Sequence, residues 1–237
     1  MKLSIVHISA ITLILLTPAM SYVYYLNTGD FNSPVIEFEF VTETVQVLDL
    51  FTNIQGPKKE IISGVNDQNK LDFIFMFNYS FLLILVFWKL KNYEKKIICN
   101  LALILSVLVF ISDIFENIQL FAITKDLESG EGFDNNIMSL IFFTRMKWYL
   151  LSVIFALLSF HYFKQRVLGK ILSLITISPL ILTSLSIFND NMEINLILSN
   201  TIMLSFLVLI IWIFLSVSIS PNISFYKKEQ KLKNYKL

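Results

Sequence analysis

The sequence is poor in the side chains that build disulfides and metal centres. Its 237 residues include one cysteine, Cys99, and two histidines, His7 and His161. A lone cysteine cannot form a disulfide within the chain, and three soft ligands in three separate apolar runs are too few to predict a metal site. The sequence therefore predicts no metal and no other cofactor.

Charge is scarce as well, and it is nearly balanced. Charged residues make up 16% of the chain, and the formal net charge is +1. Because nucleic-acid binding requires a concentrated basic surface, we expect no nucleic-acid partner.

Long apolar runs dominate the chain instead. Hydrophobic residues account for 55% of it, and 22 residues are phenylalanine. A bilayer core of about 30 Å needs about 20 apolar residues per helix, and only helices or closed barrels satisfy the backbone inside it. The unbroken runs exclude a barrel, whose strands are about 10 residues of alternating polarity. The predicted fold class is all-α, a polytopic transmembrane helical bundle in the lipid bilayer.

Six runs are long enough to span. No internal repeat and no second soluble domain is evident, so residues 1–237 form one predicted membrane domain. The first run has a second interpretation, because Lys2, the apolar residues and the small Ala19 and Ser21 are also typical of a cleaved secretory signal. We favour a retained helix, since the run stays apolar and aromatic through Tyr25. The expected spans are about 4–24, 71–88, 97–121, 138–163, 171–188 and 195–219.

Residues 25–70 form a polar segment with seven acids and three lysines. Alternating polarity at 35–40 predicts a short extended start, and the pattern that follows predicts an amphipathic helix lying at the membrane surface. Gly and Pro at 56–57 break that helix, and residues 64–70 read as a turn-rich approach to the next span.

The charges outside the spans predict an orientation. With the connecting segments assigned alternately, one side of the membrane collects 13 basic and two acidic residues, and the other collects four basic and 13 acidic residues. Basic residues near spans stay in the cytoplasm, so we expect six spans, both termini cytoplasmic, residues 25–70 extracytoplasmic, and a cell (inner) membrane location. The basic tail at 226–237 is an orientation signal, and its charge also suits anionic lipid.

Ionisable residues interrupt three of the spans. Asp113 and Glu116 lie within the third run, although a charge in hydrocarbon costs about 2.5–3.5 kcal/mol and usually marks function. At 1.5 Å per residue, Asp113 lies about 24 Å from the start of its span, and the unusual charges of the second and fourth runs reach a similar depth. The candidate intramembrane cluster is Asp72, Tyr79, Asp113, Glu116, Asn117, Arg145, Lys147 and Trp148.

Helical spacing suggests how the charges pair. Arg145 shares a face with Trp148, whereas Lys147 lies nearly opposite. On that pattern Arg145 grips Asp113 or Glu116 through two hydrogen bonds, and Lys147 extends towards the outer interface. The cluster has two interpretations at this point: a structural tie between three helices, or a functional pocket.

Four short motifs resemble a group of uncharacterised bacterial polytopic membrane proteins. The similarity covers about residues 35–150 and implies no activity. It implies Lys147, not Arg145, as the cation of interest, against the pattern of faces. The motifs are Phe38-Glu39-Phe40 with Thr42, Leu71-Asp72-Phe73 with Tyr79, Asp113-x-x-Glu116-Asn117, and Lys147-Trp148.

Three functions fit these observations. The first is transport of an ion, a proton or a small solute, in which Asp113 and Glu116 bind the cargo, Arg145 or Lys147 is the counter-charge, and Asp72 lies at the mouth. The second is a non-catalytic accessory or sensor protein whose acidic segment contacts something outside the cell. The third, a lipid-modifying membrane enzyme, has less support, because no histidine or nucleophile motif lies at the depth of the carboxylates.

Overall fold

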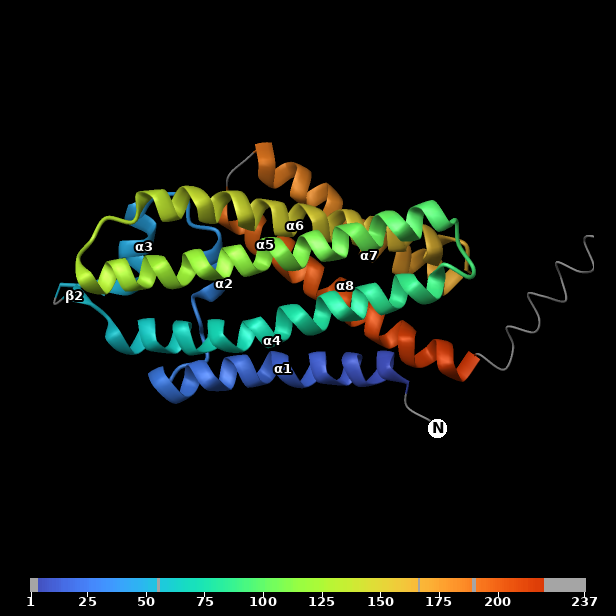
Figure 1. Ribbon diagram of the computed structural model, residues 1–237, viewed down its shortest axis with the longest axis horizontal. Coiled ribbons are helices and arrows are strands. Elements are labelled where there is room, and N and C mark those ends of the chain that lie inside the picture. The colour runs from blue at the N-terminus through green and yellow to red at the C-terminus, as the bar shows by residue number, and fades with distance from the viewer. Residues whose placement is uncertain (1–3, 55, 166, 189–190, 220–237) are drawn as a thin grey trace, which may run out of the picture.

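The computed structural model describes residues 4–54, 56–165, 167–188 and 191–219. Within these residues, six helices are long and apolar enough to cross a membrane, which confirms the all-α bundle and the number of spans predicted from the sequence. They run along one long axis (Figure 1). The six helices are α1 (Ile5–Thr28), α4 (Lys59–Leu90), α5 (Lys96–Ser129), α6 (Asp134–Phe163), α7 (Val167–Phe188) and α8 (Met192–Ile219).

Each long helix packs mainly against its neighbours in the chain, with α1 against α4, α4 against α5, α5 against α6, and α6 against α7. Helix α8 crosses the bundle obliquely (Figure 1) and contacts α7, α6 and α1. Because α6 lies between α5 and α7, two of its faces are covered. Half of its most apolar stretch is buried, against 22% for α7.

Short elements close one end of the bundle (Figure 1). They are α2 (Val35–Glu39), α3 (Thr44–Phe51) and a two-stranded antiparallel hairpin of β1 (Thr52–Asn53) and β2 (Gly56–Pro57). We call this region, residues 30–58, the cap. The opposite end, which holds the start of α1 and the turn between α4 and α5, is called the basic end.

The cap has a hydrophobic core of its own. Phe38, Val47 and Phe51 pack there against residues near the ends of α4, α5 and α6, such as Val65 and Leu120. The segment is therefore folded onto the bundle. We call this cluster the cap core, and the larger cluster inside the bundle, which includes Leu82, Leu83, Val109, Phe155 and Leu209, the main core.

Two expectations about this segment were wrong. Residues 35–39 are helical, not extended, because Val35 and Phe38 are three residues apart and are buried on one helical face. Residues 64–70 are also helical. A Cβ on Gly64 would come within 2.9 Å of the Tyr24 ring, so this glycine lets α1 and α4 approach each other and does not mark a turn.

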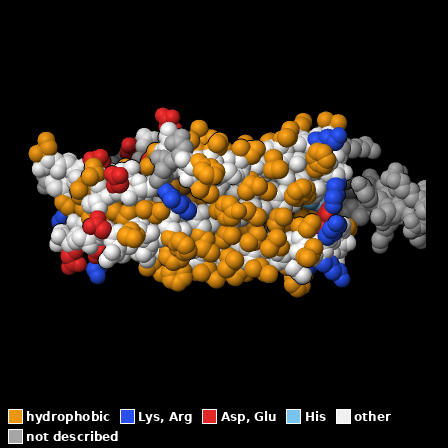
Figure 2. Space-filling view, turned by 90° about the horizontal axis from the view of Figure 1, so that it is seen from above, with side chains coloured by type: hydrophobic (Ala, Val, Ile, Leu, Met, Phe, Trp, Pro, Cys, Tyr) orange, Lys and Arg blue, Asp and Glu red, His pale blue; other side chains and the backbone are white. Residues whose placement is uncertain are grey.

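The long helices project beyond a bilayer. With 32 residues, α4 is about 48 Å long, whereas the hydrocarbon core is about 30 Å thick. Figure 2 shows apolar side chains over the middle of the bundle, Asp and Glu gathered at the cap end, and Lys and Arg gathered at the basic end. The ends of α4 and α5 that pass beyond the apolar belt carry the cap core.

Candidate functional site

A layer of charged and polar side chains separates the cap core from the main core. On α4 this layer begins beyond Val65 of the cap core and ends at Tyr79, and on α5 it lies between Leu120 of the cap core and Val109 of the main core. The end of α2 reaches it from the cap. We call the five ionisable groups Glu39, Asp72, Asp113, Glu116 and Lys147 the charged cluster.

Lys147 lies at the centre of the charged cluster. Its Nζ is 2.7 Å from Glu116 Oε2, 2.9 Å from Glu39 Oε2 and 3.3 Å from Asp113 Oδ1. An ammonium carries three N–H donors, so these three carboxylates match its donor count. The Lys147 side chain is 7% exposed and that of Glu116 is fully buried. One lysine thus joins the cap to two membrane-spanning helices.

The predicted pairing of Arg145 was wrong. The ion pairs of Asp113 and Glu116 are made by Lys147, and the Arg145 side chain is exposed. The physical reason is that α6 is covered on two sides. The face shared by Arg145 and Trp148 continues to Ser152, whose hydroxyl hydrogen-bonds Thr183 of α7 at 2.6 Å, so that face points to α7 and the Lys147 face points to α5.

Neutral side chains hydrogen-bond the remaining oxygens of the buried carboxyl groups of Asp113 and Glu116. The Tyr79 hydroxyl donates to Asp113 Oδ2, and the Thr144 hydroxyl donates to Glu116 Oε1 at 3.0 Å. Because these bonds use the oxygens that do not face Lys147, each of the two carboxyl groups is held from two sides. Such doubly held groups have fixed orientations.

Asp72 joins the layer through an amide. Asn117 Nδ2 donates to Asp72 Oδ2 at 2.6 Å, which ties α4 to α5. Asp72 is close enough to interact electrostatically with Asp113 and Lys147. Asp72 lies fourteen residues into α4, because that helix begins at Lys59, directly after the cap.

The charged cluster carries an excess of acid. Within the described residues it has four carboxyl groups and one ammonium, a formal charge of −3 when all are ionised. Because Asp113 and Glu116 contact the same nitrogen, their contacting oxygens lie no more than about 6 Å apart. Two like charges at about 5 Å repel by about 3 kcal/mol at an effective dielectric constant of 20. An arrangement of this kind favours uptake of protons or of a cation.

The charged cluster lies at the same level as exposed apolar side chains. On α5, the apolar residues Phe115 and Ile118 are exposed on either side of the buried Glu116. On α6, Phe142 and Tyr149 are exposed on either side of the buried Lys147. On these parts of α5 and α6 the outer surface is therefore apolar where the interior is charged, as expected of an intramembrane polar site, whereas the exposed Arg145 lies at the same level on the side of α6 towards α7.

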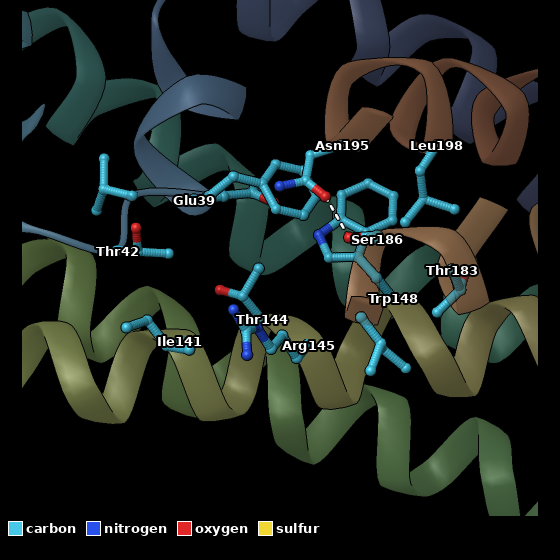
Figure 3. A pocket seen from close by; sticks show the side chains of 13 residues that line it. Glu39, Thr42, Ile141, Thr144, Arg145, Trp148, Thr183, Ser186, Asn195 and Leu198 are labelled. Carbon is cyan, nitrogen blue, oxygen red and sulfur yellow. Dashed lines mark hydrogen bonds between the residues drawn. The ribbon is translucent and has the colours of Figure 1, made fainter. Parts of the chain in front are cut away.

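A small cavity adjoins the charged cluster. It has a volume of about 30 Å³, room for one or two water molecules, and lies among the end of α2, α6, α7 and α8 (Figure 3). Glu39 and Thr144 belong both to its lining and to the polar layer, and Arg145 and Trp148 line it from α6. On its far side Ser186 donates a hydrogen bond to Asn195.

Sequence reasoning about the candidate site missed Glu39 and Thr144. Glu39 was named in the family-like motif around Phe38, but its partner Lys147 is 108 residues away. Thr144 is three residues before Lys147 and therefore lies on the same face of the helix. This spacing could have identified Thr144 as a member of the site.

The soft ligands noted in the sequence do not assemble. Within the part of the chain that the structure describes, no group of three or more His, Cys, Asp or Glu residues is placed to hold a metal. His161 instead pairs with Glu94 at 2.9 Å at the basic end, where Lys164 also bonds that carboxylate. Partial burial raises the pKa of Glu94, but the hydrogen bonds from Lys164 and His161 outweigh it, so the pKa lies below its usual range.

No protein-family model, no curated protein and no solved structure matches the chain. The motif resemblance to bacterial polytopic proteins remains a prediction. A function for this integral membrane protein therefore follows from the site alone.

Proposed function

We propose that the protein transports protons or small cations across the membrane, with the charged cluster as the binding site. The observation that carries the proposal is the charged cluster inside the bundle, in which three carboxyl groups contact the Lys147 ammonium and a fourth, Asp72, is held nearby by Asn117. Acidic groups are rare at this depth and mark ion and proton pathways. The excess of carboxyl groups makes a positive cargo the suitable one.

The Lys147 ammonium already occupies the position of a cation among three carboxylates. An arriving proton or cation competes with it for Glu39, Asp113 or Glu116, and so weakens one of its ion pairs. Because the Glu39 pair joins the cap to α6, cargo binding is coupled to release of the cap. Gating of this kind usually depends on an element with two conformations, here the cap, whose equilibrium shifts when the cargo binds.

The same proposal includes an orientation in the cell (inner) membrane. Both termini are cytoplasmic and the cap is extracytoplasmic, which the asymmetry of basic and acidic residues supports. Helix α1 is retained as a span. Its Ser9 hydroxyl donates to Asn78 Oδ1 of α4 at 2.9 Å inside the bundle. The basic tail, with its predicted attraction to anionic lipid, lies outside the described residues.

A second candidate function is a non-transporting sensor or accessory protein. It is favoured by the position of Tyr79, where the described polar layer ends. On the basic side of Tyr79 the main core includes Leu82, Leu83 and Phe155, and among the described residues no Asp, Glu, Lys or Arg is buried there, although Ser106 and Ser159 are. A charged cluster that ligands reach from one end of the bundle is suited to a sensor. A lipid-modifying enzyme has less support, because Asp113 and Glu116 are buried and a lipid ester does not reach them.

A flux assay tests transport. The full chain is reconstituted in liposomes that contain a pH-sensitive dye, with parallel samples that contain sodium- or potassium-sensitive dyes. We expect an imposed gradient of one of these ions to dissipate faster than in empty liposomes.

A matched pair of variants assigns the flux to the site. Glu116→Gln removes a buried charge at nearly constant shape, and Glu128→Gln changes an exposed residue of the same helix. Glu116→Gln should slow the flux at least fivefold and Glu128→Gln should leave it unchanged. Flux equal to that of empty liposomes for all three ions refutes transport and leaves the sensor.

A further inference from the structure

The cavity next to the charged cluster has an open rim and a buried floor. Arg145 and Ile187 at its rim are exposed, whereas Thr144 and Trp148 at its floor are buried. The floor therefore touches the charged cluster, since Thr144 bonds Glu116, and the rim leads outward. This geometry connects the buried carboxyl groups to the outer surface of the bundle near the cap.

The indole N–H of Trp148, which lines this cavity, is a buried polar group without a hydrogen-bond partner among the described residues. Its side chain is 7% exposed, its ring is stacked on Phe40 at 5.5 Å between centroids, and among the described residues its Nε1–H has no hydrogen-bond partner. An unpaired buried donor costs about 1–3 kcal/mol, and native proteins satisfy such groups with protein atoms or ordered water. Figure 3 shows the indole nitrogen on the edge of the ring that faces the cavity.

The dimensions of the cavity select its occupant. About 30 Å³ accommodates one or two water molecules and excludes an organic solute. A buried water needs two to four polar partners. The Trp148 indole can donate to it, and Glu39 and Thr42, which line the same space, can accept from it.

Glu39 is the carboxyl group common to the cavity and the charged cluster. Its Oε2 binds Lys147, and it lines the cavity. When water in the cavity carries an extra proton, one O–H bond of the hydronium breaks as the Glu39 carboxylate gains that proton, and neutral water remains. The charged groups around Glu39 are Lys147 and Arg145 from α6, Asp113 and Glu116 from α5, and Asp72 from α4.

We infer that this cavity binds water and is the route by which protons reach the charged cluster from the cap end, with Trp148 Nε1–H holding the water against Glu39. The use of protons rests on the proposed function, whereas the presence of water does not. This route leads to the cap end, because among the described residues no Asp, Glu, Lys or Arg is buried in the main core beyond Tyr79.

Indole NMR tests the inference on the full chain in detergent micelles. The chain has three tryptophans, so ¹⁵N-labelled indole groups give three N–H signals, and Trp88→Phe and Trp212→Phe assign the Trp148 signal by elimination. We expect a water exchange cross-peak at Trp148 Nε1–H despite its burial. A Trp148 signal without that cross-peak, protected in D₂O for hours, overturns the inference.

Filling the cavity provides the matched comparison. Ser186→Leu places a larger side chain in the cavity, and Ser184→Leu makes the same change on the same helix at an exposed position outside the lining. Ser186→Leu should slow the Trp148 exchange at least tenfold, and Ser184→Leu should leave it unchanged. Thr42→Leu fills the cavity from the cap and repeats the test if Ser186→Leu does not fold.

The two filling variants, Ser186→Leu and Thr42→Leu, separate this inference from the proposed function. A water signal that Ser186→Leu removes, in a protein without flux, refutes transport and supports the water site. An exchange rate that neither filling variant changes overturns the cavity as the route of the water. Proton flux in the wild type with a dry Trp148 also overturns the route and leaves transport standing.

Discussion

Replacing Lys147 by methionine removes the only cation that contacts Glu39, Asp113 and Glu116 in the described structure, and nearly preserves the volume of the side chain. At an effective dielectric constant of 20, a charge pair 3 Å apart is worth about 5 kcal/mol before desolvation. Desolvation offsets much of that energy, and loss of one partner of a buried pair typically costs about 3–5 kcal/mol. We therefore expect Lys147→Met to lower the free energy of unfolding by about 3–5 kcal/mol at neutral pH.

The destabilisation should depend on pH. Without Lys147 the remaining carboxylates repel one another when ionised, and protonation removes that repulsion. The difference in stability between wild type and Lys147→Met should therefore shrink as the pH falls. In thermal unfolding of the detergent-solubilised protein, about 3–5 kcal/mol corresponds to a midpoint lower by about 6–20 °C for a chain of this size.

Two variants control this experiment. Lys125→Met removes an exposed cation from α5, and should change the midpoint by less than about 2 °C. Lys147→Met with Glu116→Gln removes a charge of each sign, and should recover part of the stability. A Lys147→Met midpoint within 2 °C of wild type, or one whose deficit is the same at all pH values, refutes the central role of Lys147.

Three further predictions concern single contacts. Tyr79→Phe leaves Asp113 Oδ2 without its tyrosine donor and should cost about 1–3 kcal/mol in the same unfolding assay, unless Asp113→Asn is already present. The pKa of Glu94 is depressed, so its contribution to folding stability is present above the unfolded-state pKa and is lost as the pH falls through the folded-state pKa. The unfolding midpoint should therefore fall less steeply in acid for Glu94→Gln than for wild type. Identical slopes for the two proteins would contradict the ion-pair assignment. Gly64→Ala should cost about 1–3 kcal/mol by overpacking, whereas Gly132→Ala, which meets nothing within 4 Å, should be near neutral.

Residues 35–40 and Gly64 illustrate how local patterns mislead when tertiary contacts decide the conformation. Residues 35–40 alternate in polarity, which predicted an extended segment. They form a helix instead, and Val35 and Phe38 lie on one helical face that packs into the cap core. Gly64 predicted a turn because glycine is common there, but its lack of a side chain serves the contact between α1 and α4. In each case the deciding neighbour lies in a distant part of the chain.

The sequence by itself determined the number of spans and the presence of buried charge. Both depend on local features, a run of apolar residues and an acid within it, and each helix meets the requirements of the bilayer by its own length and composition. Only the tertiary structure decided which charges meet. Glu39 reaches Lys147 across 108 residues, and Lys147 takes the place expected of Arg145. The reason is that α6 packs against α5 on one side and α7 on the other, so its own sequence does not show which side faces the carboxyl groups of α5.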